Sequence, residues 1–351
     1  MAISTHLVAQ RVKFQRALHE WYRVHHRKLP WRDSPSLYKT VVSEFMLQQT
    51  QVATALPYFE RWQRELPNFA ALAAASEKKV MKLWEGLGYY SRARNLHKLA
   101  QLIVERKSET RTPREWMELP GIGPYTAAAI TSISFSEPAA CVDGNVVRIL
   151  ARLTNEQTLF RNGSEAAKSF TPLADGLIVG SDPGTHNQAM MELGATICFR
   201  QKPLCLVCPV ATFCAGYKNG EPEKLPRLQP KKIEQRSVIR AWCEIDGKIL
   251  LKRGHAAAKR LAGLHELPEF SDLGLADPDQ KSLLAVKRRA ITRFQITESI
   301  HEVRPGPALL KKIRSDHSLE WVSLSELDQI TLSGPHKRWI DEIATKRKTA
   351  W

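Results

Sequence analysis

Four cysteines lie close together in the chain, and their spacing is that of ligands to one metal group. They follow the pattern Cys198-x6-Cys205-x2-Cys208-x5-Cys214. Four thiolates so near one another in sequence can hold one 4Fe-4S cluster. Structural zinc is the alternative, because four thiolates also form a tetrahedral zinc site. Zinc ligands usually come as two short Cys-x2-Cys pairs well apart, so the single Cys-x2-Cys with wider flanking gaps favours the iron–sulfur cluster.

A second stretch, residues 119–126, has the form of a tight hairpin that could bind an anion. It is written Leu-Pro-Gly-Ile-Gly-Pro-Tyr-Thr. Gly121 and Gly123 lack the Cβ atoms that would keep another backbone away, and Pro124 is well tolerated at the first position of a helix. The loop amides and the helix N-terminus would then face an anion. A simple corner between two helices is the alternative, since Gly-x-Gly alone is weak evidence.

The charge of the chain indicates which anion this is. The net charge is +16 and the pI about 9.7, which favours a polyanionic partner. An anionic membrane surface would call for a long basic amphipathic helix, and the sequence shows none. Nucleic acid is therefore the leading candidate for the partner. Arg200 and Lys202, within the first cysteine gap, would place cations where a phosphate could meet them.

Cysteine usage and the N-terminus indicate the compartment. Six cysteines in 351 residues are too few for a secreted disulfide scaffold. Residues 1–30 are too polar for a signal peptide, and no apolar run approaches membrane-spanning length. We therefore expect a soluble, cytoplasmic protein with no membrane partner.

Two acidic residues could carry out chemistry on a nucleotide of that partner. Glu44 lies beside an apolar helical stripe and just before the amide-rich residues 48–51, which could hydrogen-bond base edges. Asp143 follows the hairpin closely. Breaking an N-glycosidic bond needs one protonated carboxyl for the leaving base and one ionised carboxylate for the cationic sugar. Neither would stand out alone among 36 acids, but a base in duplex DNA must be flipped out to be attacked, and the hairpin supplies the grip.

The elements that position these residues are helices as far as about residue 217. Glu44 falls on a predicted helix over 38–51, and Tyr89 lies in a Gly-x-Gly-Tyr-Tyr turn between two others. That turn is either simply packed or a wedge that pushes an aromatic ring into a base stack. No convincing strand pattern occurs, so this region is predicted to be all-α. The predicted helices cover residues 7–26, 38–51, 59–66, 78–84, 91–106, 147–179 and 186–199, and residues 113–134 form the hairpin unit of two helices joined by the tight turn.

The pattern changes after a polar, proline-containing linker at residues 218–236. Residues 237–347 form a predicted α+β domain. Asp246-Gly247 is a hairpin signal between two strand-like stretches. The predicted strands are 238–245, 248–251, 294–300 and 319–322, and the predicted helices lie near 278–288 and 335–346.

The first 217 residues resemble the helix-hairpin-helix DNA glycosylase superfamily, which contains endonuclease III, and within it the MutY family of adenine DNA glycosylases. The resemblance implies a six-helix barrel at about residues 35–137, inserted in an iron–sulfur cluster domain formed by residues 1–34 and 138–217. The matching stretches are residues 29–32, 43–52, 86–92, 119–126, 143–146, 187–194 and the four cysteines.

The resemblance also implies an activity, a monomer associated with the nucleoid of a bacterium, and a set of roles. The enzyme would be a monofunctional glycosylase of base excision repair, hydrolysing the N-glycosidic bond of adenine mispaired with 8-oxoguanine or guanine in double-stranded DNA. Glu44 would protonate adenine N7 and later handle the attacking water, and Asp143 would stabilise the oxocarbenium ion. Further residues implied are Asn145 and Tyr125 beside Asp143, Trp31, Arg32, Val52 and Gln188 around adenine, and Gln49 and Tyr89 intercalating next to the opposite 8-oxoguanine.

Tyr125 distinguishes between relatives. Bifunctional relatives resembling endonuclease III carry a lysine there, which attacks C1′ and forms a Schiff base. Tyrosine cannot form that imine, which implies a monofunctional enzyme. Thymine-mismatch relatives share the tyrosine but lack the additional C-terminal domain, and they remain the alternative.

Residues 237–347 resemble the MutT-like C-terminal domain of the same family, which recognises 8-oxoguanine. Residues 261–268 fit the family's Leu-Ala-Gly-Leu-Trp-Glu-Leu-Pro with His265 in place of tryptophan. No Nudix box is present, so nucleotide hydrolysis is not expected. The family's Phe-Ser-His loop aligns with Ile291-Thr292-Arg293, where Thr292 would keep a hydroxyl contact and Arg293 replaces the histidine.

A different class of function is a DNA-binding redox sensor whose cluster reports charge transfer without chemistry on bases. The pair Glu44 and Asp143 argues against it, because a protein that only binds DNA has no need of buried acids.

Overall fold

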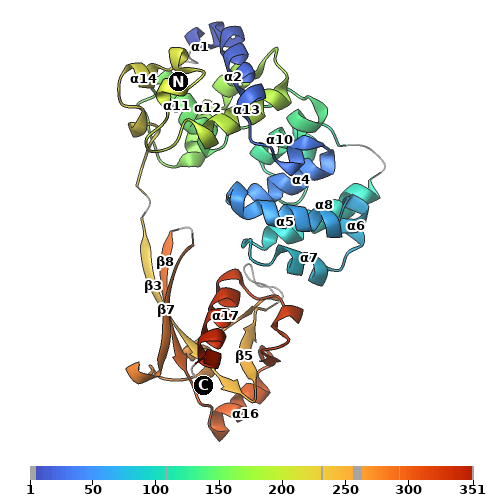
Figure 1. Cartoon of the computed structure of the whole chain (residues 1–351), viewed down its shortest axis with the longest axis vertical. Helices are drawn as coiled ribbons and strands as arrows, with labels where there is room; N and C mark the ends of the chain where they lie inside the picture. Colours follow the sequence, from blue (N-terminus) through green and yellow to red (C-terminus); the bar gives the residue numbers. More distant parts are fainter. Residues whose placement is uncertain (1–4, 107–109, 231, 256–262, 292, 350–351) are drawn as a thin grey trace. The chain divides into compact units, whose positions relative to one another are not determined.

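The computed structural model describes residues 5–106, 110–230, 232–255, 263–291 and 293–349. Its contacts divide the chain into two compact units (Figure 1). Unit 1 comprises Met1–Ala73 and Lys98–Pro230, and unit 2 comprises Ala74–His97 and Lys231–Trp351. Among the described residues, no helix has both the length and the apolar character needed to span a bilayer.

Helices make up nearly all of unit 1. Their starts follow from local chemistry: the Ser36 hydroxyl accepts the backbone N–H of Lys39, and Thr112 and Glu115 form a reciprocal capping box. The helices are α1 (Thr5–Ala9), α2 (Arg11–His25), α3 (Pro30–Asp33), α4 (Leu37–Leu47), α5 (Val52–Glu65), α6 (Phe69–Ala74), α9 (Pro113–Met117), α10 (Pro124–Phe135), α11 (Gly144–Thr154), α12 (Gly163–Ile178), α13 (Pro183–Thr196) and α14 (Ala215–Lys218). In unit 2 lies α7 (Glu77–Trp84), and α8 (Ser91–Glu105) runs from unit 2 into unit 1.

Two short strands depart from the all-helical prediction for residues 1–217. Strand β1 (Leu159–Phe160) pairs in parallel with β2 (Arg227–Leu228). Strands of two residues carry too little sequence to show alternation, so no pattern could have predicted them. The pairing also ties part of the predicted linker, residues 218–236, to the helical unit.

One apolar core holds together the helices that surround the cysteine segment. Helices α2, α11, α12 and α13 contribute fully buried side chains, among them Phe14, Leu150, Phe170 and Leu193. Because α11 packs on α12, α13 and α14, its N-terminus, where Asp143 lies, has a fixed position within the unit.

Unit 2 contains two sheets. In the first, β3 (Glu234–Trp242) pairs in parallel with β8 (Phe294–Glu302), and β7 (Leu283–Ile291) pairs antiparallel with β8. In the second, the antiparallel strands are β4 (Glu244–Ile245), β5 (Lys248–Arg253), β6 (His265–Glu266) and β9 (Leu319–Ser323). The helices are α15 (Phe270–Leu273), α16 (Pro307–Ser315) and α17 (Gly334–Thr349).

The α+β prediction for this region is right in most elements and wrong in one. Asp246 and Gly247 both have positive φ, as a two-residue turn between β4 and β5 requires. The helix predicted near 278–288 is wrong, because residues 283–291 form β7. Short apolar segments do not reveal their period, and pairing along the whole of β8 decides the outcome.

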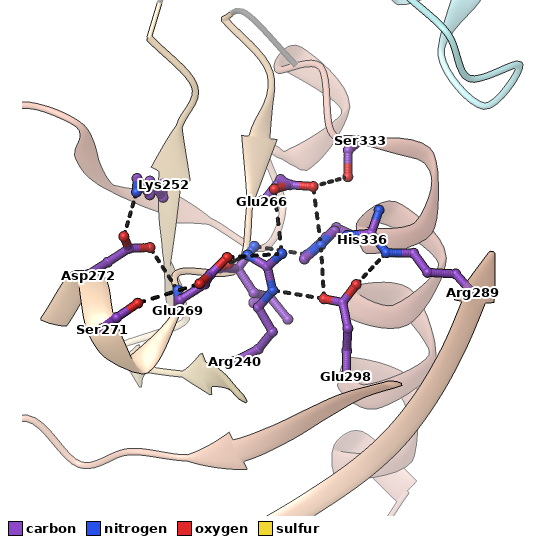
Figure 2. Close-up of polar contacts among 11 residues, drawn as sticks. Arg240, Lys252, Glu266, Glu269, Ser271, Asp272, Arg289, Glu298, Ser333 and His336 are labelled. Carbon is purple, nitrogen blue, oxygen red and sulfur yellow. Dashed lines mark hydrogen bonds and ion pairs between the residues drawn. The ribbon is translucent and has the colours of Figure 1, made fainter. Parts of the chain in front are cut away.

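A buried ion network connects the two sheets and α17 (Figure 2). The Glu298 carboxylate, 0% exposed, accepts hydrogen bonds from Nε of Arg240, at 2.8 Å, and from Nε of Arg289. Arg240 is itself buried and also donates to the carbonyl oxygen of Leu267 at 2.8 Å. Two guanidinium groups thus compensate one carboxylate that has no access to solvent.

His336 on α17 completes the network in its neutral form. Its Nδ1 accepts the backbone N–H of Leu267 at 3.0 Å, and its Nε2 lies 3.3 Å from Oε1 of Glu266. Burial and the nearby Arg240 and Arg289 hold the pKa of His336 well below its usual value. The ring therefore serves as an uncharged bridge between strand β6 and helix α17.

We expect Glu298→Gln to destabilise unit 2 by about 3–5 kcal/mol, because the buried Arg240 and the half-buried Arg289 lose the carboxylate that both contact, and Arg240 keeps only carboxylates 3.7 Å away. Urea unfolding monitored by tryptophan fluorescence measures this. The control is Glu342→Gln, which removes an ion pair between Lys287 and a more exposed carboxylate and should change stability by less than about 1 kcal/mol. Equal effects of the two substitutions would contradict the prediction.

Candidate active site

One cavity of about 190 Å³ in unit 1 collects most of the predicted site residues. Its walls come from α3, α4, α5, α10, α13 and the start of α11, so stretches far apart in sequence meet there. The predicted residues that line it are Trp31, Arg32, Glu44, Val52, Tyr125, Asp143, Asn145 and Gln188.

Glu44 reaches this cavity from α4. The neighbouring apolar side chains Val41, Phe45 and Met46 are fully buried, which turns this face of the helix inward and takes Glu44 with it. Only 7% of Glu44 is exposed. Burial, and then the nearby charge of Asp143, raise the pKa of Glu44 to about 7. The carboxyl can therefore carry a proton near neutral pH and give it up, as a general acid must.

Asp143 occupies the N-cap of α11. Its Oδ1 accepts the backbone N–H groups of Asn145 and Val146, each at 2.8 Å, and its Oδ2 accepts Nδ2 of Asn145 at 3.1 Å. Burial raises the pKa of Asp143, while these hydrogen bonds act in the opposite direction. A helix N-terminus also favours a negative charge. The second carboxyl is thus held by groups that stabilise its ionised form.

Tyr125 lies in the first turn of α10, directly after the hairpin. Its hydroxyl donates to Sδ of Met191 at 2.9 Å. Burial, followed by the charge of Glu44, raises the pKa of Tyr125 well above its usual value, so the ring stays neutral. In the hairpin, Gly121 has φ +78°, a conformation that favours glycine, and Gly123 is the N-cap of α10.

Arg32 is oriented by a carboxylate that sequence reasoning did not select. Glu192 on α13 is 0% exposed and accepts NH2 of Arg32 at 3.0 Å. Arg27 holds the same carboxylate through Nε at 2.7 Å and NH2 at 3.0 Å. Glu192 falls in the motif 187–194, and a lone acid among the apolar and small residues 189–194 is the signal that could have found it.

The other pocket residues have defined partners. Trp31 packs edge-on against Phe59, with ring centroids 5.0 Å apart. Oε1 of Gln188 accepts the hydroxyl of Tyr22 at 3.1 Å. Val52 is the first residue of α5.

The two predicted intercalating residues lie in different units. Gln49, in unit 1, has φ +57°, and Tyr89, in unit 2, has φ +47° and is 46% exposed. Both residues occupy the left-handed region in turns, where a side chain is presented by the backbone rather than by a regular element.

An arginine on α11 connects this site to the cysteine segment. Arg148 donates through NH2 to Oδ1 of Asn145 at 2.9 Å and through Nε to the carbonyl oxygen of Cys198 at 2.8 Å. One turn later, Arg152 donates to Sγ of Cys198 at 3.2 Å. Neither arginine was singled out from the sequence, because a basic residue on a helix is usually only a solvated group.

The four predicted cysteine ligands line one small cavity together with Arg152 and Tyr217. The set fits an iron–sulfur cluster in its chemistry: four thiol sulfurs, apolar neighbours and a guanidinium donor to sulfur. In the described part of the chain, no group of three or more His, Cys, Asp or Glu side chains is arranged to hold a metal ion. Arg200 and Lys202 are both exposed just before Cys205, and Lys202 has φ +49°.

The predicted 8-oxoguanine residues fall only partly within the structure. Thr292, like residues 261–262 of the Leu-Ala-Gly motif, lies outside the described residues. Arg293 is exposed, with its Nε 2.9 Å from Oε1 of Glu234 and its guanidinium 5.1 Å from the Phe294 ring. His265, in place of the family's tryptophan, is buried with Nε2 3.2 Å from Oε2 of Glu320.

We expect Glu44 to make stability depend on pH. Its pKa is about 7 in the folded chain against 4.5 ordinarily, so its support for folding is complete below pH 4.5 and is lost as the pH rises through 7. Between pH 4.5 and pH 8, the free energy of unfolding of Glu44→Gln should therefore rise by about 3 kcal/mol relative to that of the unchanged protein. Urea unfolding at several pH values measures the difference. The control is Glu60→Gln at an exposed position. The expectation is refuted if the difference in unfolding free energy between Glu44→Gln and the unchanged protein does not vary with pH.

Comparisons with known proteins show which proteins this chain is similar to. Residues 42–169 match the model of the HhH-GPD superfamily of base excision DNA repair proteins. The chain is 42% identical over 237 residues to an adenine DNA glycosylase of Rattus norvegicus, covering 63% of this chain and 45% of that protein. It is 37% identical over 223 residues to an adenine DNA glycosylase of Buchnera aphidicola, covering 62% of this chain and 63% of that protein. The chain therefore matches 45% to 63% of the length of these two relatives, less than two thirds of either.

A solved structure shares the fold. A thermostable thymine-DNA glycosylase superposes with a TM-score of 0.52 at 25% identity, covering 60% of this chain and 98% of that one.

Proposed function

From the match of residues 42–169 to the model of the HhH-GPD superfamily, we propose that the chain is a monofunctional adenine DNA glycosylase of base excision repair. Its substrate would be double-stranded DNA in which adenine faces 8-oxoguanine or guanine. The observation that carries the proposal is that Glu44, with a pKa of about 7, and Asp143 line the same cavity. The names of the similar proteins support adenine as the base removed.

Glu44 is the proposed general acid. An adenine flipped into the cavity would meet a carboxyl whose pKa of about 7 keeps a substantial fraction of it protonated at neutral pH. Transfer of this proton to N7 would make adenine a better leaving group. The carboxylate left behind could then accept a proton from the water that attacks the sugar.

Asp143 is the proposed stabiliser of the cationic sugar. Its hydrogen bonds to Asn145 and Val146, and its place at the N-terminus of α11, favour the ionised carboxylate. A fixed negative charge is worth most in a site with little water, where screening is weak. The two carboxyls would thus work in different protonation states, as acid–base pairs do.

Tyr125 supports hydrolysis without strand cleavage. Its neutral hydroxyl is engaged by Met191 and offers no amine that could form an imine with C1′. The same tyrosine would suit removal of thymine, so thymine opposite guanine is the competing substrate, favoured by the structural likeness to a thymine-DNA glycosylase.

Cys198, Cys205, Cys208 and Cys214 are the proposed ligands of a 4Fe-4S cluster. When bound, the cluster would supply a rigid four-point cross-link of the segment that follows α13. Arg152 would donate a hydrogen bond to a ligand sulfur, and Arg148 would transmit the position of Cys198 to Asn145. The cysteine segment would in this way help to place the site that contains Asp143.

Contacts to DNA are proposed at several places. The amides of the hairpin at Gly121 and Gly123, together with Arg200 and Lys202, would bind phosphates. Gln49 and Tyr89 would enter the base stack. The C-terminal residues 237–347 would form the MutT-like domain that contacts 8-oxoguanine, with Arg293 near the lesion. In a bacterial cell, such an enzyme would act on DNA of the nucleoid.

We expect the purified protein to release adenine from duplexes with adenine opposite 8-oxoguanine, seen as strand scission after hot alkali. Asp143→Asn should lower the single-turnover rate at least about 100-fold while leaving duplex binding nearly unchanged, because only the transition state carries the sugar cation. A duplex with thymine opposite guanine is the competing substrate. Scission of that duplex alone, or full activity of Asp143→Asn, would overturn the proposal.

We expect about four irons and four acid-labile sulfides per chain when the protein is purified without oxygen. Cys205→Ser should lose both, because serine is a poor ligand for the cluster, whereas Cys243→Ser, at a buried cysteine of unit 2, should retain them. Metal and sulfide analysis provides the measurement. One zinc per chain without sulfide would contradict the cluster.

A further inference from the structure

The turn at residues 86–90 holds an aromatic side chain in an unusual backbone conformation. Tyr89 has φ +47° and is 46% exposed, and it stands between Gly86 and Gly88 on one side and Tyr90 on the other. Arg92 supports the turn from within by donating to the carbonyl oxygens of Leu87 and Gly88 at 3.1 and 3.0 Å. A tyrosine keeps a left-handed conformation only where its surroundings over-determine it.

Part of this support comes from far along the sequence. The backbone N–H of Leu332 donates to Oε1 of Glu85 at 2.8 Å, and its carbonyl oxygen accepts the hydroxyl of Tyr90 at 2.9 Å. Glu85 precedes the turn and Tyr90 ends it. A single peptide segment of unit 2 therefore bridges both ends of the turn that presents Tyr89.

Glu85 is a strong acceptor at this contact. Its side chain is 5% exposed, and its Oε2 accepts Nζ of Lys82 at 2.7 Å and Nζ of Lys337 at 3.2 Å. Lys82 also donates to the carbonyl oxygen of Ile330 at 2.9 Å. Hydrogen bonds to a charged and desolvated group are stronger than neutral ones, so this end of the bridge is firmly fixed.

Leu332 is in turn fixed to the sheets of the C-terminal part. Its side chain is 1% exposed and packs in the core with Trp242 and Leu267. On either side of it, the N–H of His265 donates to Thr331 and the N–H of Ser333 donates to His265, both at 3.0 Å. The bridge therefore extends strand β6 and cannot move independently of it.

We propose that Glu85, Tyr90 and Leu332 are positioning residues through which the C-terminal part of the chain holds Tyr89 ready to enter a base stack. The inference rests on the proposed function, in which Tyr89 is the wedge. It adds that residues 231–351 act on the wedge through the protein as well as by touching the opposite base. When the bridge is lost, the Tyr89 side chain is still present, but the backbone turn that presents it is no longer held.

The test uses Tyr90→Phe in the full-length chain, since this change removes only the hydroxyl, which donates to Leu332 at 2.9 Å and accepts the N–H of Gly86 at the longer distance of 3.4 Å. The duplex carries adenine opposite 8-oxoguanine, with 2-aminopurine as the neighbour of 8-oxoguanine, so that its emission reports unstacking. With protein saturating, we expect the unstacking equilibrium and the single-turnover excision rate each to fall about 2- to 10-fold, the worth of one buried hydrogen bond. Glu85→Gln should act in the same direction.

Two controls separate positioning from general damage. Glu326 is exposed and lies six residues before Leu332 in the chain. Glu326→Gln should leave both signals unchanged. In a Tyr89→Ala background, Tyr90→Phe should have no further effect, because no wedge remains to be positioned. Thermal unfolding confirms that Tyr90→Phe is folded at the temperature of the assay.

The outcomes are distinct. The proposal is overturned if Tyr90→Phe and Glu85→Gln both match the unchanged protein, or if Tyr90→Phe lowers excision equally with and without Tyr89. If the unchanged protein unstacks 2-aminopurine but releases no adenine, the proposed function fails. In that case the emission measurements with Tyr90→Phe alone still decide the positioning role.

Discussion

Desolvation of one carboxyl group is the constraint on which unit 1 depends. Glu44 is nearly inaccessible to water and lies close enough to Asp143 for the second charge to raise its pKa further. Ionisation there is unfavourable, so the fold must either hold a proton or lose stability. The apolar face of α4 enforces this burial. The N-terminus of α11, in contrast, stabilises the negative charge of Asp143. Two acids on separate helices thereby have different surroundings: Glu44 is desolvated, and Asp143 is hydrogen-bonded by backbone amides.

Helix α11 connects the cavity that contains Asp143 to the cysteine segment and to the apolar core of unit 1. Its first turn binds Asp143, its middle carries Arg148, and its last turns carry Arg152 and the apolar core. A displacement of the cysteine segment would therefore move Asn145 through the side chain of Arg148, which contacts both. The same principle operates in unit 2, where the backbone of Leu332 bridges a turn while its side chain is buried in the core.

Sequence was sufficient where residue type and local spacing decide the structure. The helix that carries Glu44, the glycine hairpin before Tyr125 and the Asp246-Gly247 turn all follow from short-range rules. Partners distant in sequence could not be predicted in this way. Glu192 acquires meaning only when α13 meets Arg27 and Arg32, and β7 becomes a strand only because β8 pairs with it. Resemblance to a family supplied roles for residues, yet it did not indicate Arg148 or Leu332.

The anchoring of Arg32 by Glu192 has a consequence for what the cavity admits. Its charged lining residues are Arg27, Arg32, Glu44, Asp143 and Glu192. With Glu44 protonated, two guanidinium groups face two carboxylates, and the enclosure is electroneutral. An uncharged aromatic heterocycle can enter such a space without a counterion, whereas a free nucleotide monophosphate would bring an unmatched negative charge. For the proposed substrate, such a lining would favour an uncharged base over a charged soluble metabolite before any hydrogen bond to the base is formed.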